Sequence, residues 1–227
     1  MVARRVVFIV AGGKLGGREF FRKMLAKVSP EAVICADGGA RHLEAVGAIP
    51  DFVIGDMDSI DPGTLRRYEE AGCRVVRHSR RKDETDTELA LQEALALEPV
   101  EVWIWGGMGK RIDHTLANIS LLSRGMRQRV MIKLVDRWCE VFMIDRKMIL
   151  DGKKGQTVSL LPVTPKVTGV TLSGFEYPLK NSEMEAGHPY GVSNRLMGSR
   201  GVIEIGAGLL LAIRYFQPDV FPEGEGE

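Results

Sequence analysis

The sequence predicts an α/β domain, an open and largely parallel sheet with helices, followed by an all-β sandwich domain. Two observations carry this prediction. Up to about residue 124, short apolar runs alternate with helix-like segments, as in sheets whose strands are joined by crossover helices. From about residue 135, short β-like runs alternate with turns and carry no convincing helix. We therefore expect an α/β domain over residues 1–130 and a β-sandwich over residues 131–227.

The chain opens with a strand and a glycine loop. Residues 4–11 are rich in β-branched side chains and continuously apolar from Val6, which is typical of a strand covered on both faces. Glycines fill four of the six positions 12–17, and an amphipathic segment spans residues 19–27. This order opens a Rossmann-like phosphate-binding unit. The glycine spacing itself matches neither a Walker loop nor a strict dinucleotide fingerprint.

Further strand–helix pairs follow along the first domain. Asp61 and Pro62 predict an N-cap with proline at the first helical position, and Thr85 with Glu88 predicts a capping box. Gly125 is a natural stop for the last helix. Predicted strands cover residues 33–36, 52–54, 74–77 and 101–105, with helices over residues 40–46 and 114–123. In the second domain, strands are predicted over residues 140–144, 147–150, 157–162, 167–172, 201–205 and 209–216.

The loop after the third strand carries paired carboxylates. Asp56 and Asp58 stand two residues apart, so in extended backbone their side chains face one spot. Two carboxylates aimed at one place repel unless a cation lies between them or one takes up a proton. Oxygen ligands of this kind suit Mg²⁺, which usually arrives with phosphates. From this stretch alone, an acidic turn and a metal site remain equally open interpretations.

Other acidic or glycine-rich loops decide between these two interpretations. They follow the second, fourth and fifth predicted strands, and in open parallel sheets ligands bind outside the carboxyl ends of the strands. We therefore predict a site at this edge of the sheet. Carboxylates for magnesium, with cations for phosphate oxygens, are what phosphoryl-type transfer requires. The loops supply the carboxylates Asp37, Asp56, Asp58, Asp83, Asp86 and Asp113, and the cations Lys82, Lys110 and Arg111.

Composition excludes several classes of protein. A formal net charge of +1 gives no support for a nucleic-acid partner, since such proteins usually carry a marked basic excess. Three scattered cysteines, outside any CxxC pattern, argue against a disulfide framework and a thiolate zinc site, and fit a reducing cytoplasm. No apolar stretch has the length needed to span a bilayer, so we expect no membrane partner.

Five motifs together resemble the thiamine pyrophosphokinase family. The match extends from Val6 to Tyr215, in order and at sensible spacing. Each motif is modest alone, and the set is highly specific. The motifs are ADGGA (residues 36–40), PDFVIGDMDS (50–59), DETDTELA (83–90), GGMGKRIDHTLAN (106–118) and GVSN (191–194).

The resemblance implies an activity and an assembly. Members transfer a pyrophosphoryl group from ATP to the hydroxyl of thiamine, giving thiamine diphosphate and AMP, with Mg²⁺ as cofactor. The resemblance also implies a homodimer whose active site is shared between subunits.

The same resemblance implies roles for individual residues. Asp56, Asp58 and Asp86 are implied magnesium ligands, and Asp86 or Asp113 is the candidate general base, if one is needed. Tyr177, Ser193 and Asn194 are implied thiamine contacts. The nucleotide and phosphate environment comprises Asp37, Gly38, Gly39, Ser59, Lys82, Gly107, Lys110, Arg111 and His114.

Several positions depart from the family pattern or keep a second interpretation. Met57 replaces an aromatic residue, and Lys110 stands where glycine is common. Tyr177 replaces a tryptophan that stacks on thiamine in eukaryotic members, and it reads equally well as an ordinary sandwich aromatic. In the basic run, we expect Arg77, Arg80 and Arg81 to be solvated and Lys82 to turn inward. Trp103 and Trp105 are expected in the core.

Two rival functions remain at this stage. One is a different magnesium-dependent transferase acting on a pterin or another small alcohol. The other is a non-catalytic sensor of nucleotides or thiamine compounds, for which so complete a set of acidic loops would be unnecessary.

Overall fold

The structure is a computed structural model that describes residues 5–81, 83–109 and 111–218. The chain divides into two compact units, Met1–Arg137 and Trp138–Glu227. The division lies seven residues beyond the predicted domain boundary, because the segment after residue 130 forms a strand of the first unit.

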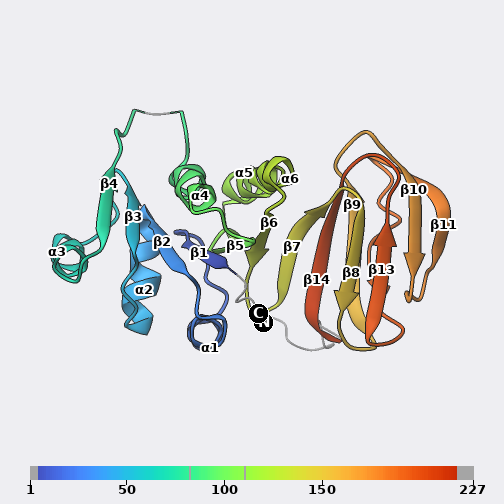
Figure 1. The fold of residues 1–227 in the computed structure, drawn as a ribbon, viewed down its shortest axis with the longest axis horizontal. Coiled ribbons are helices and arrows are strands. Elements are labelled where there is room, and N and C mark those ends of the chain that lie inside the picture. Colours follow the sequence, from blue (N-terminus) through green and yellow to red (C-terminus); the bar gives the residue numbers. More distant parts are fainter. Residues whose placement is uncertain (1–4, 82, 110, 219–227) are drawn as a thin grey trace. The chain divides into compact units, whose positions relative to one another are not determined.

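The first unit is built on a parallel sheet (Figure 1). Its strand order is β6-β5-β1-β2-β3-β4. In this order the chain moves outward from β1 to β4, then returns to the other side of β1 to add β5 and β6. The strands are β1 (Val6–Val10), β2 (Ala32–Ala36), β3 (Phe52–Gly55), β4 (Arg74–Arg77), β5 (Glu101–Trp105) and β6 (Met131–Val135).

Strand β6 was not among the predicted strands. It pairs in parallel with β5, with Met131 opposite Glu101 and Val135 opposite Trp105. The segment is short and follows a helix almost directly, so its local pattern does not distinguish a closing strand from the end of a connection. Its partner in the sheet decides the matter.

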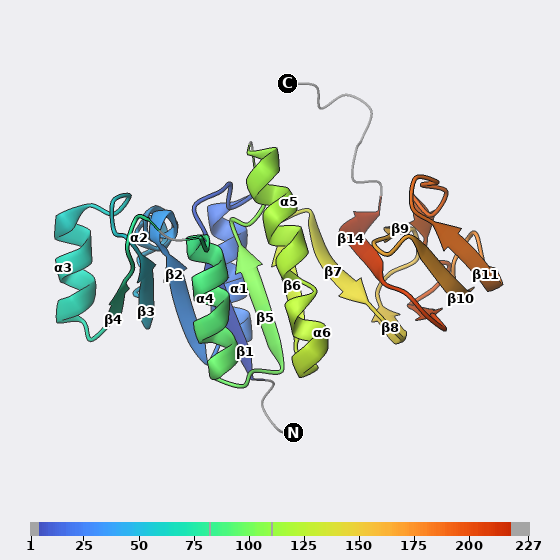
Figure 2. The same cartoon turned by 90° about the horizontal axis from the view of Figure 1, so that it is seen from above.

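Helices cover both faces of this sheet. Figures 1 and 2 show α4, α5 and α6 on one face and α1 and α2 on the other. Helix α3 joins α2 through Arg67, whose guanidinium pairs with Glu44, and Tyr68, whose hydroxyl donates to the Ala40 carbonyl. The helices are α1 (Arg18–Val28), α2 (Ala40–Val46), α3 (Pro62–Glu70), α4 (Asp86–Ala96), α5 (Ile112–Leu121) and α6 (Arg124–Gln128), with a 3₁₀ turn, η1 (Asp37–Gly39), before α2.

Two predicted helix starts are confirmed and one predicted stop is wrong. The Asp61 carboxylate accepts the backbone N–H of Thr64 at 2.9 Å, and the Thr85 hydroxyl accepts that of Glu88 at 3.1 Å. Gly125 does not end the last helix but lies inside α6. A side chain there would meet the Val130 carbonyl oxygen at 2.2 Å, so this glycine is required for close packing rather than for a helix C-terminus.

The core of the first unit is aromatic around β1 and β5. Phe8, Phe21 and Trp105 are fully buried, and the rings of Phe21 and Trp105 meet edge-on with centroids 5.0 Å apart. Trp103 stacks on Phe8 at 5.4 Å and is only half-buried. Large aromatic side chains of this kind fix the two strands against α1.

The second unit consists of two antiparallel sheets, as the predicted sandwich requires. One has the order β12-β9-β14-β7 and the other β11-β10-β13-β8. The strands are β7 (Cys139–Ile144), β8 (Lys147–Asp151), β9 (Gln156–Pro162), β10 (Lys166–Ser173), β11 (Leu179–Glu185), β12 (Asn194–Arg195), β13 (Arg200–Glu204) and β14 (Leu210–Pro218). The predicted fold class is confirmed. Strands β11 and β12 were not predicted, and within the described ranges no helix is long and apolar enough to cross a membrane.

Candidate functional site

A cavity of about 480 Å³ opens at the carboxyl ends of the parallel strands in the first unit. The loops after β1, β2, β3 and β5, and the start of α4, all contribute to it. In an open sheet this is the switch point, where neighbouring strands send their connections to opposite sides. The lining residues are Ala11, Gly12, Gly13, Lys14, Ala36, Asp37, Gly38, Arg41, Ser59, Thr85, Asp86, Thr87, Gly106, Gly107, Met108, Gly109, Arg111, His114, Thr115 and Asn118.

The floor of the cavity is two glycine loops bonded to each other. The parallel pairing of β1 with β5 continues beyond the strands, because Gly13 N–H donates to the Gly106 carbonyl at 2.9 Å and Lys14 N–H donates to that of Met108 at 3.1 Å. A side chain at Gly13 would lie 2.3 Å from the Gly106 oxygen. These positions therefore require glycine, and the loops present backbone to whatever fills the cavity.

Polar side chains hold these loops from both sides. Arg41 at the start of α2 hydrogen-bonds the Gly12 carbonyl, and His42 Nε2 lies 2.7 Å from the Gly13 carbonyl oxygen. Burial lowers the pKa of His42, so at neutral pH its ring is uncharged and Nε2 carries the proton that it donates. Opposite, the buried Asn118 amide donates to the Gly107 carbonyl at 2.7 Å.

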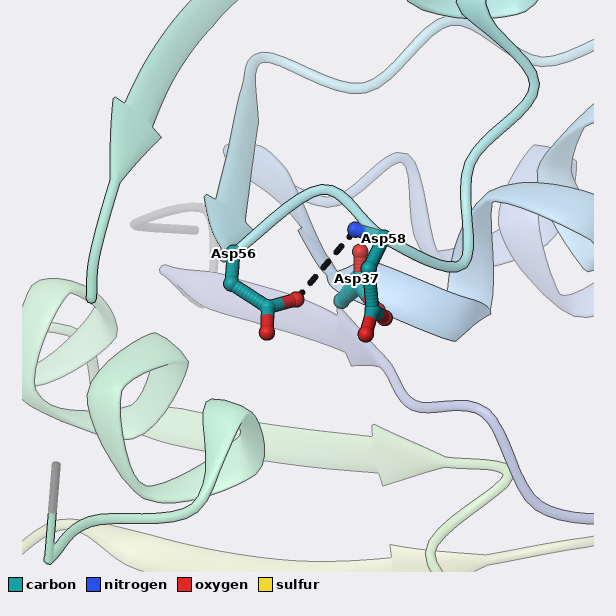
Figure 3. Close-up of side chains that lie close together, drawn as sticks. All are labelled: Asp37, Asp56 and Asp58. Carbon is teal, nitrogen blue, oxygen red and sulfur yellow. Dashed lines mark hydrogen bonds between the residues drawn. The ribbon is translucent and has the colours of Figure 1, made fainter. Parts of the chain in front are cut away.

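Three carboxylates meet beside this cavity. Asp37, Asp56 and Asp58 each offer an oxygen, and these oxygens lie within 4.8 Å of one another. Figure 3 shows the three side chains converging, with the Asp58 backbone N–H donating to Asp56 at 3.2 Å. Asp86, at the first turn of α4, approaches the same point, since a side chain built on Gly55 would meet its Oδ1 at 3.2 Å.

Asp37 is the buried member of the group. Its residue is 4% exposed, and within the described part of the chain its buried Oδ1 has no hydrogen-bond partner. Burial raises the pKa of Asp37, and the neighbouring charges of Asp86, Asp56 and Asp58 raise it further, against a hydrogen bond from Ser59. Its φ of 30° is unusual for a residue with a side chain. A buried carboxylate that has one oxygen without a hydrogen bond and lies in strained backbone fits a site for a cation.

One cation, the Arg80 guanidinium, lies against two of these carboxylates. Arg80 Nη2 lies 2.9 Å from Asp58 Oδ2, and its Nε lies 3.4 Å from Asp56 Oδ2. Arg80 is solvated, as expected, with a side chain that is 72% exposed, and its ion pairs with these two carboxylates were not predicted. Lys82, expected to turn inward, lies outside the described residues, as does Lys110.

The predicted residues of the fifth loop separate into two sets. Arg111 and His114 line the cavity, whereas Asp113 is 61% exposed and paired with the Arg111 guanidinium. That pairing holds the pKa of Asp113 well below its usual range. Of the predicted nucleotide residues, Gly38, Ser59 and Gly107 also line the cavity. Gly39 does not, and packs so closely on β1 that an added side chain would meet the Val10 oxygen at 1.9 Å.

In the second unit, the structure brings Tyr177 to the GVSN motif. The buried Asn194 side chain accepts the Tyr177 N–H at 3.0 Å and donates to its carbonyl at 2.9 Å. Ser193 is exposed and has a φ of 61°, and its N–H donates to the Ser159 hydroxyl at 3.0 Å. Tyr177 is 64% exposed. Asn194 therefore acts through backbone that it fixes, leaving Tyr177 and Ser193 to face outward.

The chain matches two family models in order along its length. They are "Thiamin pyrophosphokinase, catalytic domain" over residues 23–134 and "Thiamin pyrophosphokinase, vitamin B1 binding domain" over residues 144–210. Thiamine pyrophosphokinase of Bacillus subtilis (strain 168) is 35% identical over 183 residues, which are 80% of this chain and 86% of the relative. The chain belongs to the thiamine pyrophosphokinase family.

Solved structures of thiamine pyrophosphokinases agree with this assignment. The crystal structure from Bacillus subtilis superposes with a TM-score of 0.82 at 32% identity, covering 93% of this chain and 99% of that one. The structure from Geobacillus thermodenitrificans gives a TM-score of 0.81 at 28% identity, covering 95% and 100%. The predicted family, and with it the predicted enzyme class, are confirmed.

Sequence reasoning missed part of the cavity lining. The glycine loop after β1 was noted, but Lys14 was not assigned to the site. Arg41 and His42 were also missed, since nothing in a helix start indicates that it will hold the loop after a different strand. Asn118 is the last residue of the motif GGMGKRIDHTLAN, and this position could have indicated that its amide holds the Gly107 loop.

We predict that Gly13→Ala disrupts the floor of the cavity. The added methyl group must push apart two backbone segments that are hydrogen-bonded to each other, which typically costs about 1–3 kcal/mol. Urea unfolding followed by tryptophan fluorescence measures the loss. Gly17→Ala is the matched control, because its nearest neighbour is the flexible Arg137 side chain, at 3.2 Å. Equal losses in the two variants would contradict the close packing of the two loops.

We predict that Asp37→Asn stabilises the metal-free protein at pH 7. The folded-state pKa of Asp37 is raised, so its charge opposes folding above that pKa, and the penalty vanishes below about pH 3.9, where the carboxyl is protonated in both states. For a chain of this size, 1 kcal/mol corresponds to a melting-temperature gain of about 2–4 °C. Asp113→Asn, which removes a paired exposed carboxylate, should give no gain. A lower melting temperature for Asp37→Asn would contradict the inference that the buried charge of Asp37 opposes folding.

Proposed function

We propose that this chain transfers a pyrophosphoryl group from ATP to the hydroxyl of thiamine, forming thiamine diphosphate and AMP, with Mg²⁺ as cofactor. The observation that carries the proposal is one cavity in which glycine backbone for phosphates adjoins a converging carboxylate cluster for a metal. Family membership supplies the acceptor. We further propose that the first unit is the catalytic, nucleotide-binding domain and the second the thiamine-binding domain, with the division after Arg137 rather than after the predicted residue 130.

The carboxylates fit a magnesium ion. Asp56, Asp58 and Asp86 are the proposed ligands, and Asp37 adds a buried oxygen that is without a partner among the described residues. Oxygen ligands of this type are what magnesium prefers. When bound, the ion supplies charge neutralisation to the phosphate oxygens.

The glycine loops and nearby cations are proposed to hold the triphosphate. Lys14 and Arg111 line the cavity together with backbone from both loops. Gly38, Ser59, Gly107 and His114 line it as well, and Gly39 supports it by letting η1 approach β1. Fixed dipoles and cations aimed at the developing charge are the main source of acceleration in phosphoryl transfer. Lys82 and Lys110, also proposed here, lie outside the described residues.

Thiamine is proposed to contact Tyr177 and Ser193, with Asn194 fixing the backbone of Tyr177. An exposed aromatic ring suits the cationic thiazolium or the flat pyrimidine. If a general base accepts the hydroxyl proton, we propose Asp86 rather than Asp113. Asp86 lies in the cavity wall, whereas Asp113 is held by Arg111 and its lowered pKa makes it a weak base.

We also propose a homodimer with a shared active site, in the cytoplasm. Supporting it, Ile112 and Leu116 are 65% and 60% exposed on one face of α5, beside the cavity-lining His114. Exposed apolar side chains at i and i+4 form a surface suited to a partner. All three cysteines are buried and none is in a disulfide, which fits a reducing compartment.

We predict that wild-type protein with Mg²⁺, ATP and thiamine yields AMP and thiamine diphosphate in equal amounts. Asp58→Asn should lower kcat by at least about 100-fold, because it removes a metal ligand charge at the reacting phosphates. Chromatography of nucleotides and thiamine esters measures both products. Val163→Ala, a change of one exposed sandwich residue, is the control and should keep full activity.

The products also separate the rival functions. ADP with thiamine monophosphate would indicate simple kinase chemistry and contradict the proposal. Turnover with a pterin or another alcohol, but not with thiamine, would assign a different acceptor. Binding of nucleotide or thiamine with no turnover would indicate a sensor.

We predict that multi-angle light scattering gives a mass of about twice the 25.1 kDa of the chain. A double change of Ile112 and Leu116 to serine should shift the protein towards monomer, since it removes apolar surface from the proposed interface. The matched control is Ile49→Ser, which removes an exposed apolar side chain elsewhere in the first unit. A monomeric wild-type protein at micromolar concentration would contradict the homodimer.

A further inference from the structure

Arg80 lies on the carboxylates that are proposed to hold the metal. It belongs to the segment between β4 and α4, and one guanidinium reaches both Asp58 and Asp56, at 2.9 and 3.4 Å. A single cation that bridges two carboxylates neutralises the same repulsion that a divalent ion would. The Arg80 guanidinium therefore neutralises two of the carboxylates that are proposed to bind magnesium.

Arg80 contacts the carboxylate cluster only on its solvent-exposed side. Its side chain is 72% exposed, while those of Asp58 and Asp56 are 41% and 17% exposed. Among the described residues Arg80 pairs with Asp56 and Asp58, while the Oδ1 atom of the buried Asp37 has no hydrogen-bond partner. The guanidinium thus satisfies the outer carboxylates and leaves the inner one for another cation.

The ion pairs of Arg80 are weak enough to exchange. The Arg80 side chain is solvent-exposed, and ion pairs of exposed side chains contribute little to stability. Arg80 also stands in a segment outside the helices and strands. Its guanidinium offers a planar fork of donors, which suits phosphate oxygens better than it suits separated carboxylates. Once displaced, it would remain beside the site where a triphosphate meets the carboxylates.

We propose that Arg80 is the counter-ion of Asp56 and Asp58 in the metal-free protein and becomes a ligand of the ATP phosphates when the metal takes its place. This inference rests on the proposed function and adds to it a residue that contacts the substrate. It also assigns a reason for an arginine that the family motifs do not contain. Arg80 prevents the empty carboxylate pair from repelling itself, and then supplies positive charge to the group being transferred.

Metal binding without nucleotide tests the first half of the proposal. Mn²⁺ is titrated into wild type, Arg80→Gln and Arg81→Gln, and free Mn²⁺ is measured by electron paramagnetic resonance. Arg81 is the matched control, since its substitution removes the same charge from the next position, and the hydrogen bond that Arg81 donates to the Ser79 hydroxyl comes from its backbone N–H. We expect Arg80→Gln to bind Mn²⁺ about two- to five-fold more tightly than Arg81→Gln, because the competing ion pairs are gone.

Nucleotide binding tests the second half. With Mg²⁺ saturating, Arg80→Gln should bind ATP about ten-fold more weakly by calorimetry, the cost of a charged hydrogen bond, while Arg81→Gln stays within about two-fold of wild type. Arg80→Lys keeps the charge without the fork, and should restore wild-type Mn²⁺ affinity but only part of the ATP affinity.

Three outcomes would overturn the proposal. Equal Mn²⁺ affinities for Arg80→Gln and Arg81→Gln would reduce the pair to a surface contact. Unchanged ATP affinity in Arg80→Gln would remove the phosphate role. If Asp58→Asn leaves Mn²⁺ binding unchanged, the proposed metal site itself is wrong, and that result is distinguishable because it does not involve Arg80.

Discussion

The parallel pairing of β1 with β5 is the interaction on which the site depends. Those strands are neighbours in the sheet although about ninety residues of chain separate them, and their ladder runs on into the two glycine loops. Since Gly13 and Gly106 have no side chains, the loops approach each other closely and leave their backbone facing the cavity. The buried Phe8, Phe21 and Trp105 fix the strands beneath. Loops on so rigid a base hold a fixed geometry without secondary structure of their own.

Acidic residues in the segments that follow β2 and β3 place negative charge beside this backbone. The charge of the buried Asp37 carboxylate, whose pKa is raised, opposes folding. Interactions elsewhere in the unit must offset this local destabilisation. Residues at such sites commonly trade stability for function. The neighbouring carboxylates Asp56 and Asp58 form ion pairs with the exposed Arg80. The proposed cation site is therefore built from several loops at this edge and not from one loop.

The second unit uses a different device. The Asn194 side-chain amide hydrogen-bonds the backbone N–H and carbonyl of Tyr177, seventeen residues away. Gly191 lies too close to the Leu160 carbonyl oxygen to carry a side chain. The motif that marks the family therefore consists partly of residues that position others. Sequence comparison alone treats all four GVSN residues alike, because a hydrogen bond to distant backbone leaves no local pattern.

The sequence by itself determined the fold class, the family, the helix starts at Asp61 and Thr85, and the loops from which the site is proposed. These depend on local periodicity, capping chemistry and motif spacing, all of which short stretches of chain contain. Tertiary structure alone decided that β6 closes the parallel sheet, that Gly125 and Gly39 serve packing, and that Arg41 and His42 hold the first glycine loop. It also separated Asp113, paired with Arg111, from the carboxylates that converge. Each of these depends on which distant segments become neighbours, and that is set by the order of strands in the sheet.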